Sequence, residues 1–233
     1  MLKNYFLDVN KKLVKKRAGK KTGIDKPASG IDEKFLLEKL ADIMPKGFKI
    51  DNAKPLDSSG FSPEGADLIV YREYCQEVVK LFNGYVPYEL IHGAVFIVND
   101  LTKTTLADAI NRVSTVKKIN RFSETETEYT VPSFILANAS ADYPLAELKN
   151  DILNYYISRG IEDESEFEIM ALLNKGIIVK DWHQGKRSFA ALETLEDTFM
   201  WFYILYSEYI EVEREEEFDL RKYVRNDKIY KEF

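Results

Sequence analysis

The amino-acid sequence predicts a mixed α/β domain in which helices cover both faces of a central sheet. Two nearly continuous apolar runs, residues 67–71 (DLIVY) and 93–98 (GAVFIV), have the length and composition of buried strands. A helical pattern follows at 102–120, where apolar residues form one stripe, and another strand-like run follows at 131–137. Strands that alternate with helices in this way are typical of mixed sheets flanked by helices.

The N-terminal elements have signals of their own. Apolar residues three to four positions apart predict a short amphipathic helix that ends near Gly19, and residues 20–30 have the Gly, Pro and Ser content of a linker. Asp32 is an N-cap candidate for a second helix, which Pro45 ends, and a short strand is expected over the segment 45–50.

The C-terminal half continues the alternation. A helix is expected at 145–157, and two strands joined by a turn are expected at 167–173 and 176–180. A long helix is then expected from Leu192 to about Phe218, because aromatic and aliphatic residues recur there at helical spacing. We therefore divide the chain into a basic helical arm and linker (1–30), an α/β domain (31–219) and a C-terminal tail (220–233).

Composition narrows the class of protein. The 233 residues are 45% hydrophobic and 31% charged, which is ordinary for a globular chain and excludes a disordered or fibrous one. There is no apolar run of membrane-spanning length and no secretory signal pattern at the N-terminus, so we expect a cytoplasmic protein with no membrane partner. The single cysteine, Cys75, excludes an internal disulfide and a cysteine-based zinc site.

The net charge of −6 is unevenly distributed. Nine basic and two acidic residues leave residues 1–26 at +7 and the rest of the chain at −13. A basic arm is a candidate nucleic-acid contact, and it is equally consistent with a solvated helix face or a strap across the acidic body. The candidate phosphate contacts are Lys11, Lys12, Lys15, Lys16 and Arg17.

Seven acidic residues gather at the expected end of the long helix. They are Glu208, Glu211, Glu213, Glu215, Glu216, Glu217 and Asp219. Negative charge there opposes the helix dipole, so this cluster favours a cationic partner. A protein partner at this acidic helix, or self-association of the chain, is therefore expected alongside the nucleic-acid hypothesis.

Several common catalytic patterns are absent from the sequence. There is no GxxxxGK[ST] phosphate loop, no GxGxxG after a strand and no GxSxG elbow. His92 and His183 lie too far apart in the sequence for a zinc-ligand pattern, and we expect both to be structural. No resident cofactor is therefore expected.

Asp67 is the residue with the clearest chemical signal. It stands at the head of a hydrophobic strand, where a carboxylate must be satisfied by hydrogen-bond donors or by a cation. Divalent-metal nucleases use such an aspartate. A second carboxylate on the neighbouring strand completes their magnesium site, and a lysine two residues later stabilises charge on the phosphate.

The chain from Ile31 to Ala137, and more loosely to Tyr209, resembles a known family. The matching segments are MPKGF at 44–48, SGF at 59–61, GADLIVY at 65–71, VP at 86–87, AVFIVN at 94–99, LTK at 101–103, PSFILA at 132–137 and LNKG at 173–176. On these residues it is similar to an uncharacterised bacterial family of restriction-endonuclease-like, or PD-(D/E)XK, domains. The resemblance implies a restriction-endonuclease-like core, the family aspartate at Asp67 and a setting in bacterial or phage defence.

The sequence departs from that family at two motif positions. The Glu-x-Lys of the central strand falls on Ile97 and Asn99, which supply neither a carboxylate nor a positive charge. Asp100 and Lys103 follow at once, but a shift of one residue along a strand turns a side chain to the opposite face.

These departures favour a degenerate nuclease-like protein that acts by binding nucleic acid or a protein partner. Two alternatives stay open. One is an active Mg²⁺-dependent nuclease that uses Asp67, as metal ligand and catalytic residue, with Asp100 and Lys103. The other is a purely protein-directed inhibitor or assembly subunit.

Overall fold

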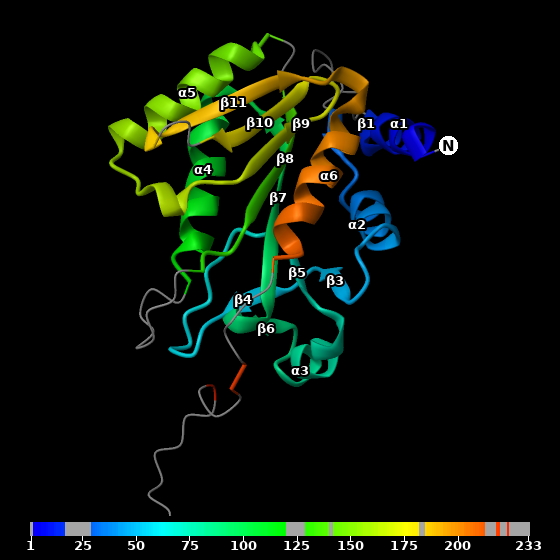
Figure 1. Cartoon of the computed structure of the whole chain (residues 1–233), viewed down its shortest axis with the longest axis vertical. Helices are drawn as coiled ribbons and strands as arrows, with labels where there is room; N and C mark the ends of the chain where they lie inside the picture. Colours follow the sequence, from blue (N-terminus) through cyan, green and yellow to red (C-terminus); the bar gives the residue numbers. More distant parts are fainter. Residues whose placement is uncertain are drawn as a thin grey trace, which may run out of the picture.

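A computed structural model describes residues 2–16, 29–119, 129–139, 142–181, 185–212, 218, 219 and 223. Its centre is a seven-stranded sheet in the order β11-β10-β9-β8-β7-β5-β3 (Figure 1). These strands are β3 (Phe48–Asp51), β5 (Leu68–Arg72), β7 (Ile91–Leu101), β8 (Ser133–Ala139), β9 (Ile169–Leu172), β10 (Gly176–Asp181) and β11 (Ser188–Glu193). The fold is the mixed α/β arrangement that the sequence predicts.

Strand β7 is the longest strand of this sheet and lies near its middle. It pairs in parallel with β8 and antiparallel with β5, and β8 pairs in parallel with β9. The other neighbouring strands pair antiparallel. Residues 91–98 of β7 are buried without interruption, because both faces of the sheet are covered.

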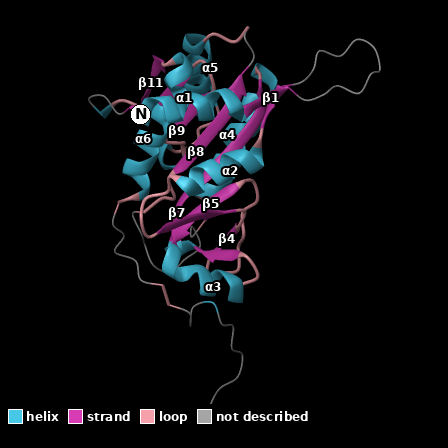
Figure 2. Cartoon of the chain, turned by 90° about the vertical axis from the view of Figure 1, so that its right-hand side faces the viewer, coloured by secondary structure: helices cyan, strands magenta, loops and turns pink. Residues whose placement is uncertain are grey.

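Helices pack against both faces of the sheet (Figures 1 and 2). One face is covered by α1 (Leu2–Leu13), α2 (Glu33–Asp42) and α6 (Thr198–Ile210), and the other by α4 (Lys103–Lys117) and α5 (Leu145–Ser158). The carboxylate of Asp32 caps α2 as predicted, and Thr102 caps α4. None of the helices in the described part of the chain is both long and apolar enough to cross a bilayer.

Smaller elements surround this core. The remaining strands and helix are β1 (Val14–Lys16), β2 (Ser29–Ile31), β4 (Lys54–Leu56), β6 (Tyr85–Pro87) and α3 (Gln76–Leu81). Short 3-10 turns lie at Glu73–Cys75, Tyr88–Leu90, Asp163–Ser165 and Leu195–Asp197. Strands β1 and β2 pair antiparallel, and β4 and β6 pair in parallel.

Three predicted boundaries are wrong. Leu192 belongs to edge strand β11, and α6 begins only at Thr198, because Leu195 takes a left-handed conformation (φ 47°) that separates strand from helix. Helix α6 ends at Ile210, and residues 213–217 lie outside the described part of the chain. The first helix ends at Leu13 instead of near Gly19, because the chain continues into β1.

Candidate functional site

Asp67 lies immediately before β5 and joins that strand to its neighbour β7. Its backbone N–H donates to the carbonyl of Val95 (2.9 Å), and its Oδ2 accepts a hydrogen bond from the backbone N–H of Ile97 (2.6 Å). The side chain is 32% exposed, so the carboxylate reaches the surface at one end of the sheet. The backbone of the neighbouring strand β7 therefore supplies one hydrogen-bond donor to the Asp67 carboxylate.

The cation beside Asp67 is Arg112, from α4. Its Nη2 lies 2.6 Å from Asp67 Oδ2. The same guanidinium donates to the Gly65 carbonyl from Nε (3.0 Å) and Nη2 (2.6 Å), and to the Ile97 carbonyl from Nη1 (3.2 Å). Arg112 thus links α4 to the segment before β5 and to β7, and it neutralises the Asp67 carboxylate.

Gly65 is the position that lets α4 come this close. Its φ of +123° is accessible to glycine, and a Cβ added there would lie 3.2 Å from Arg112 Cβ. The guanidinium also lies over the ring of Phe96, at 5.7 Å from its centroid. The position of Arg112 is therefore fixed by backbone, ring and carboxylate together.

Ile97 and Asn99, the positions on which the resemblance places the family's Glu and Lys, have structural partners. Ile97 is 6% exposed and belongs to the apolar core on the α2 side of the sheet. Asn99 accepts a hydrogen bond at Oδ1 from the backbone N–H of Ile31 (2.6 Å), and its Nδ2 donates to Glu33 Oε1 (3.3 Å). Asn99 therefore anchors β2 and the start of α2.

A cavity of about 300 Å³ opens beside Asp67. Its charged lining groups are Asp67, Glu33 from the first turn of α2 and Lys54 from β4, and Ile97 lies at its wall. Sequence reasoning missed Glu33, Lys54 and Arg112. Each comes from a segment distant in the chain, and none stands in a motif that would have singled it out.

Asp100 and Lys103 do not line this cavity. Asp100 is exposed, and the register between β7 and β8 shifts between Val98 and Leu101. Lys103 forms an ion pair with Glu147 on α5, and this hydrogen bond raises the pKa of the lysine. The three residues of the active-nuclease hypothesis are therefore divided between two environments.

One oxygen of each carboxylate beside the cavity is already engaged. Mg²⁺ requires free carboxylate oxygens in a near-octahedral arrangement. Asp67 Oδ2 already accepts hydrogen bonds from Ile97 and Arg112, and Glu33 accepts one from Asn99. Among the residues that the structure describes, no group of three or more His, Cys, Asp and Glu side chains is placed to hold a metal ion.

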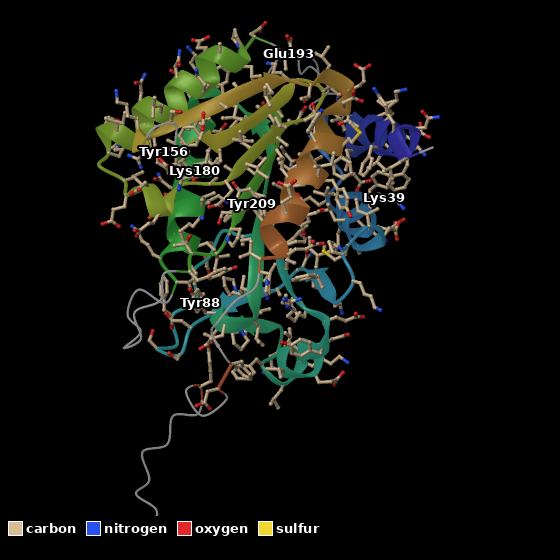
Figure 3. The ribbon with its side chains drawn as sticks, viewed as in Figure 1. Lys39, Tyr88, Tyr156, Lys180, Glu193 and Tyr209 are labelled. Atoms are coloured by element: carbon tan, nitrogen blue, oxygen red, sulfur yellow. The ribbon has the colours of Figure 1, made fainter. Side chains whose placement is uncertain are left out.

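The remaining predicted residues lie elsewhere. His92 is buried, with Nδ1 3.2 Å from the carbonyl of Ile210 and its ring edge-on to Phe48. His183 lies outside the described residues. Figure 3 shows the charged and aromatic side chains around the sheet. The residues labelled there are Lys39, Tyr88, Tyr156, Lys180, Glu193 and Tyr209.

The predicted basic residues begin on α1 and continue into β1. Lys11 and Lys12 are exposed in the last turn of α1, Lys15 and Lys16 belong to β1, and Arg17 lies outside the described residues. Strand β1 pairs with β2, and β2 lies against β7 and β8. The hydrogen bond from the Ile31 N–H to Asn99 Oδ1 therefore fixes β2 beside β7. Strand β2 in turn pairs with the basic strand β1.

Comparison with known proteins identifies the fold. No protein-family model and no curated protein matches the chain. Solved structures do: apo NucC from Escherichia coli MS115-1 is 16% identical over 94% of each chain, with a TM-score of 0.66. Its cAAA-bound form is 16% identical over 96% of each chain (TM-score 0.64), and cAAA-bound NucC from Pseudomonas aeruginosa ATCC27853 is 15% identical over 96% of each chain (TM-score 0.63). The chain has the restriction-endonuclease-like fold of these NucC structures over nearly its whole length.

Proposed function

We propose that this protein is a restriction-endonuclease-like protein that binds nucleic acid without cleaving it, in bacterial or phage defence. The observation that carries the proposal is the ion pair between Arg112 Nη2 and Asp67 Oδ2 at 2.6 Å, beside Ile97 and Asn99 on the neighbouring strand. The defence setting follows from the family resemblance and is part of the proposal.

Electrostatics supports the loss of cleavage. A phosphodiester transition state gains negative charge, and preorganised cations are the main way in which proteins stabilise it. Here the carboxylate that would hold a metal ion is paired with Arg112, and the lysine position is a neutral Asn99 whose carbonyl group already accepts from Ile31. Each of the usual charges is either absent or committed to the fold.

The placement of the basic residues supports nucleic acid as the target. Lys11 and Lys12 are exposed, and Lys15 and Lys16 follow them in the strand that pairs with β2. Lysines of this kind bind phosphates by charge, without reading base sequence. Because β2 is anchored at Asn99, a bound strand would lie near the position where the fold otherwise carries its catalytic residues.

A cleavage assay tests the first half of the proposal. Single- and double-stranded DNA and RNA are incubated with the wild-type protein, Asp67→Asn and Ile97→Glu/Asn99→Lys, in Mg²⁺ and in Mn²⁺. We expect no cleavage above the Asp67→Asn background by the wild-type protein. Wild-type cleavage that Asp67→Asn abolishes overturns the proposal.

A binding titration tests the second half. Fluorescence anisotropy of labelled DNA and RNA is measured over a range of salt concentrations for the wild-type protein. The comparison variant replaces Lys11, Lys12, Lys15, Lys16 and Arg17 by Gln. Lys46→Gln/Lys118→Gln removes two exposed lysines elsewhere and shows how far a loss of positive charge outside the segment changes the slope. Each lost phosphate contact lowers the slope of log K against log salt by about 0.9 for duplex DNA. Equal slopes in all three proteins contradict nucleic-acid binding by the basic segment.

A second candidate function is an active Mg²⁺-dependent nuclease with a rearranged site. One observation favours it: Glu33 and Lys54 line the same cavity as Asp67. This candidate predicts metal-dependent cleavage that is lost in Asp67→Asn and also in Glu33→Gln. If Asp100 and Lys103 act together with Asp67, Asp100→Asn and Lys103→Gln would be inactive and Glu33→Gln would remain active.

A further inference from the structure

Helix α6 is apolar on every side over residues 199–206. Phe199, Phe202 and Tyr206 are fully buried against the sheet, yet on the opposite side Trp201 is 41% and Ile204 is 38% exposed. A helix that is apolar on every side is normally buried on every side. Figure 1 shows α6 on the near side of the molecule, with α1 and α2 beside it and no helix drawn in front of it.

Acidic residues border this exposed apolar side. Glu208 and Glu211 are exposed on the same side of α6, one and two turns beyond Ile204, and Glu196 is exposed just before the helix. Between Arg187 and Arg214 the sequence contains no Lys, Arg or His. We call Trp201, Ile204, Glu208 and Glu211 the outer face of α6.

Helix α1 packs against α6 within the protein and shows which kind of helix α6 can bind. Helix α1 is amphipathic and basic, and its Phe6 ring packs against Phe199 (6.1 Å between centroids) and Tyr203 (5.4 Å) on the flank of α6. Beside this contact Lys3 Nζ lies 3.0 Å from Asp197 Oδ2, at the start of α6. Apolar packing and a lysine–carboxylate pair thus act together in this internal contact.

A second copy of the chain is a poor occupant of the outer face. A two-fold dimer through α6 would place the same patch on both sides of the contact. Antiparallel α6 helices would then bring the acidic residues of both copies, Glu208 and Glu211 among them, into one interface with no basic residue of the outer face to balance them. Like charges in an interface are unfavourable, so charge complementarity requires a partner with basic residues.

We propose that the outer face of α6 docks a basic amphipathic helix of a partner protein. Trp201 and Ile204 contact the apolar stripe of that helix, and Glu208 and Glu211 pair with its lysines or arginines. This surface involves none of the residues in the nucleic-acid proposal, so each proposal can fail without the other.

The probe for this surface is a fluorescein-labelled, tryptophan-free amphipathic helical peptide of Leu and Lys. Its matched control is the same peptide with Glu in place of Lys. Binding is followed by anisotropy at physiological ionic strength with the full-length protein. We expect the Leu/Lys peptide to bind and the Leu/Glu peptide not to bind.

Variants assign the binding to the outer face. Trp201→Ser/Ile204→Ser and, separately, Glu208→Lys/Glu211→Lys should each weaken binding at least about tenfold, as expected when a central anchor or its charge is lost. Leu81→Ser removes a 69% exposed leucine on α3 and serves as the matched apolar control, with binding unchanged. Circular dichroism and urea unfolding, both unchanged, show that each variant is folded.

Two outcomes overturn the proposal. One is equal peptide binding by the wild-type protein and Trp201→Ser/Ile204→Ser, which would make the attraction a property of net charge alone. The other is a wild-type dimer in light scattering that becomes a monomer in Trp201→Ser/Ile204→Ser, which would assign the outer face to a second copy.

Discussion

Arg112 Nη2 and Asp67 Oδ2 lie 2.6 Å apart, and this ion pair ties helix α4 to the start of β5. The same carboxylate oxygen accepts the backbone N–H of Ile97, so Asp67 satisfies a donor of β7 and a side chain of α4 at once. Through these contacts Asp67 links three elements of the fold.

A structural Asp67 predicts a loss of stability when it is replaced. Asp67→Ala leaves the Ile97 N–H and the Arg112 guanidinium without their acceptor, and we expect the free energy of unfolding to fall by about 2 kcal/mol. Asp67→Asn keeps an acceptor oxygen and should cost less, about 1 kcal/mol. Urea denaturation followed by circular dichroism gives both values. Asp100→Ala is the control, because Asp100 is exposed nearby, and a stability of Asp67→Ala equal to that control would contradict the structural role.

Asn99 should matter for the order of the N-terminal segment. Asn99→Ala removes the acceptor of the Ile31 N–H and the donor to Glu33 Oε1, and the expected cost is about 1 kcal/mol. Hydrogen exchange should accelerate at Ile31, while protection in β8 stays unchanged because those amides pair within the sheet. Unaltered exchange at Ile31 would show that other contacts suffice to hold β2.

The pair formed by Lys117 and Glu168 is the clearest test of buried charge. Lys117 Nζ lies 2.5 Å from Glu168 Oε1, and the Ser133 N–H donates to Glu168 Oε2 at 2.5 Å. The Lys117 side chain is 1% exposed and the Glu168 side chain is 11% exposed. Burial lowers the pKa of the Lys117 ammonium despite this partner. Lys117→Met leaves the buried Glu168 carboxylate without its cation and should lower the free energy of unfolding by about 3 to 5 kcal/mol.

A double variant at Lys117 and Glu168 separates the effect of an unpaired buried charge from the effect of lost packing. Lys117→Met/Glu168→Gln leaves no unpaired ion, and Gln still accepts from Ser133, so it should be more stable than Lys117→Met alone. Thermal and urea unfolding measure both proteins. If the double variant is the less stable of the two, packing of Lys117 outweighs its charge.

Cys75 should react slowly with thiol reagents. Its side chain is buried, and burial raises the pKa of the thiol, so little of it ionises in the folded protein near neutral pH. The unfolded thiol ionises at a lower pH than the folded one, and stability therefore decreases slightly as the pH rises above about 8.5. Labelling with Ellman's reagent, with and without denaturant, measures the protection. Rapid labelling of the native protein would contradict it, and Cys75→Ser gives the baseline.

Much of the fold was predictable because its signals are local. The buried strands are visible as apolar runs, and Asp32 and Thr102 both cap the helices that follow them. The boundary between β11 and α6 was missed, because it depends on the backbone conformation of Leu195 and not on hydrophobic pattern.

The site was only partly predictable, because its contacts are long-range. Asp67, Ile97 and Asn99 could be singled out from motif positions. Arg112 is 45 positions from Asp67 in the sequence, and Ile31 is 68 from Asn99, so neither contact leaves a local trace. Chemistry that depends on such pairs becomes visible only when the chain is folded.

The hydrogen bond between Asn99 and Ile31 also bears on how the proposed function could change. A lysine at position 99 would remove the acceptor of the Ile31 N–H, and a glutamate at position 97 would place a charge where Ile97 now packs in the core. Making Asp67 available to a metal ion would in addition require the release of Arg112. On the proposed function, a gain of cleavage therefore needs several changes that each remove a contact of the fold, and the intermediates would be less stable than the protein itself.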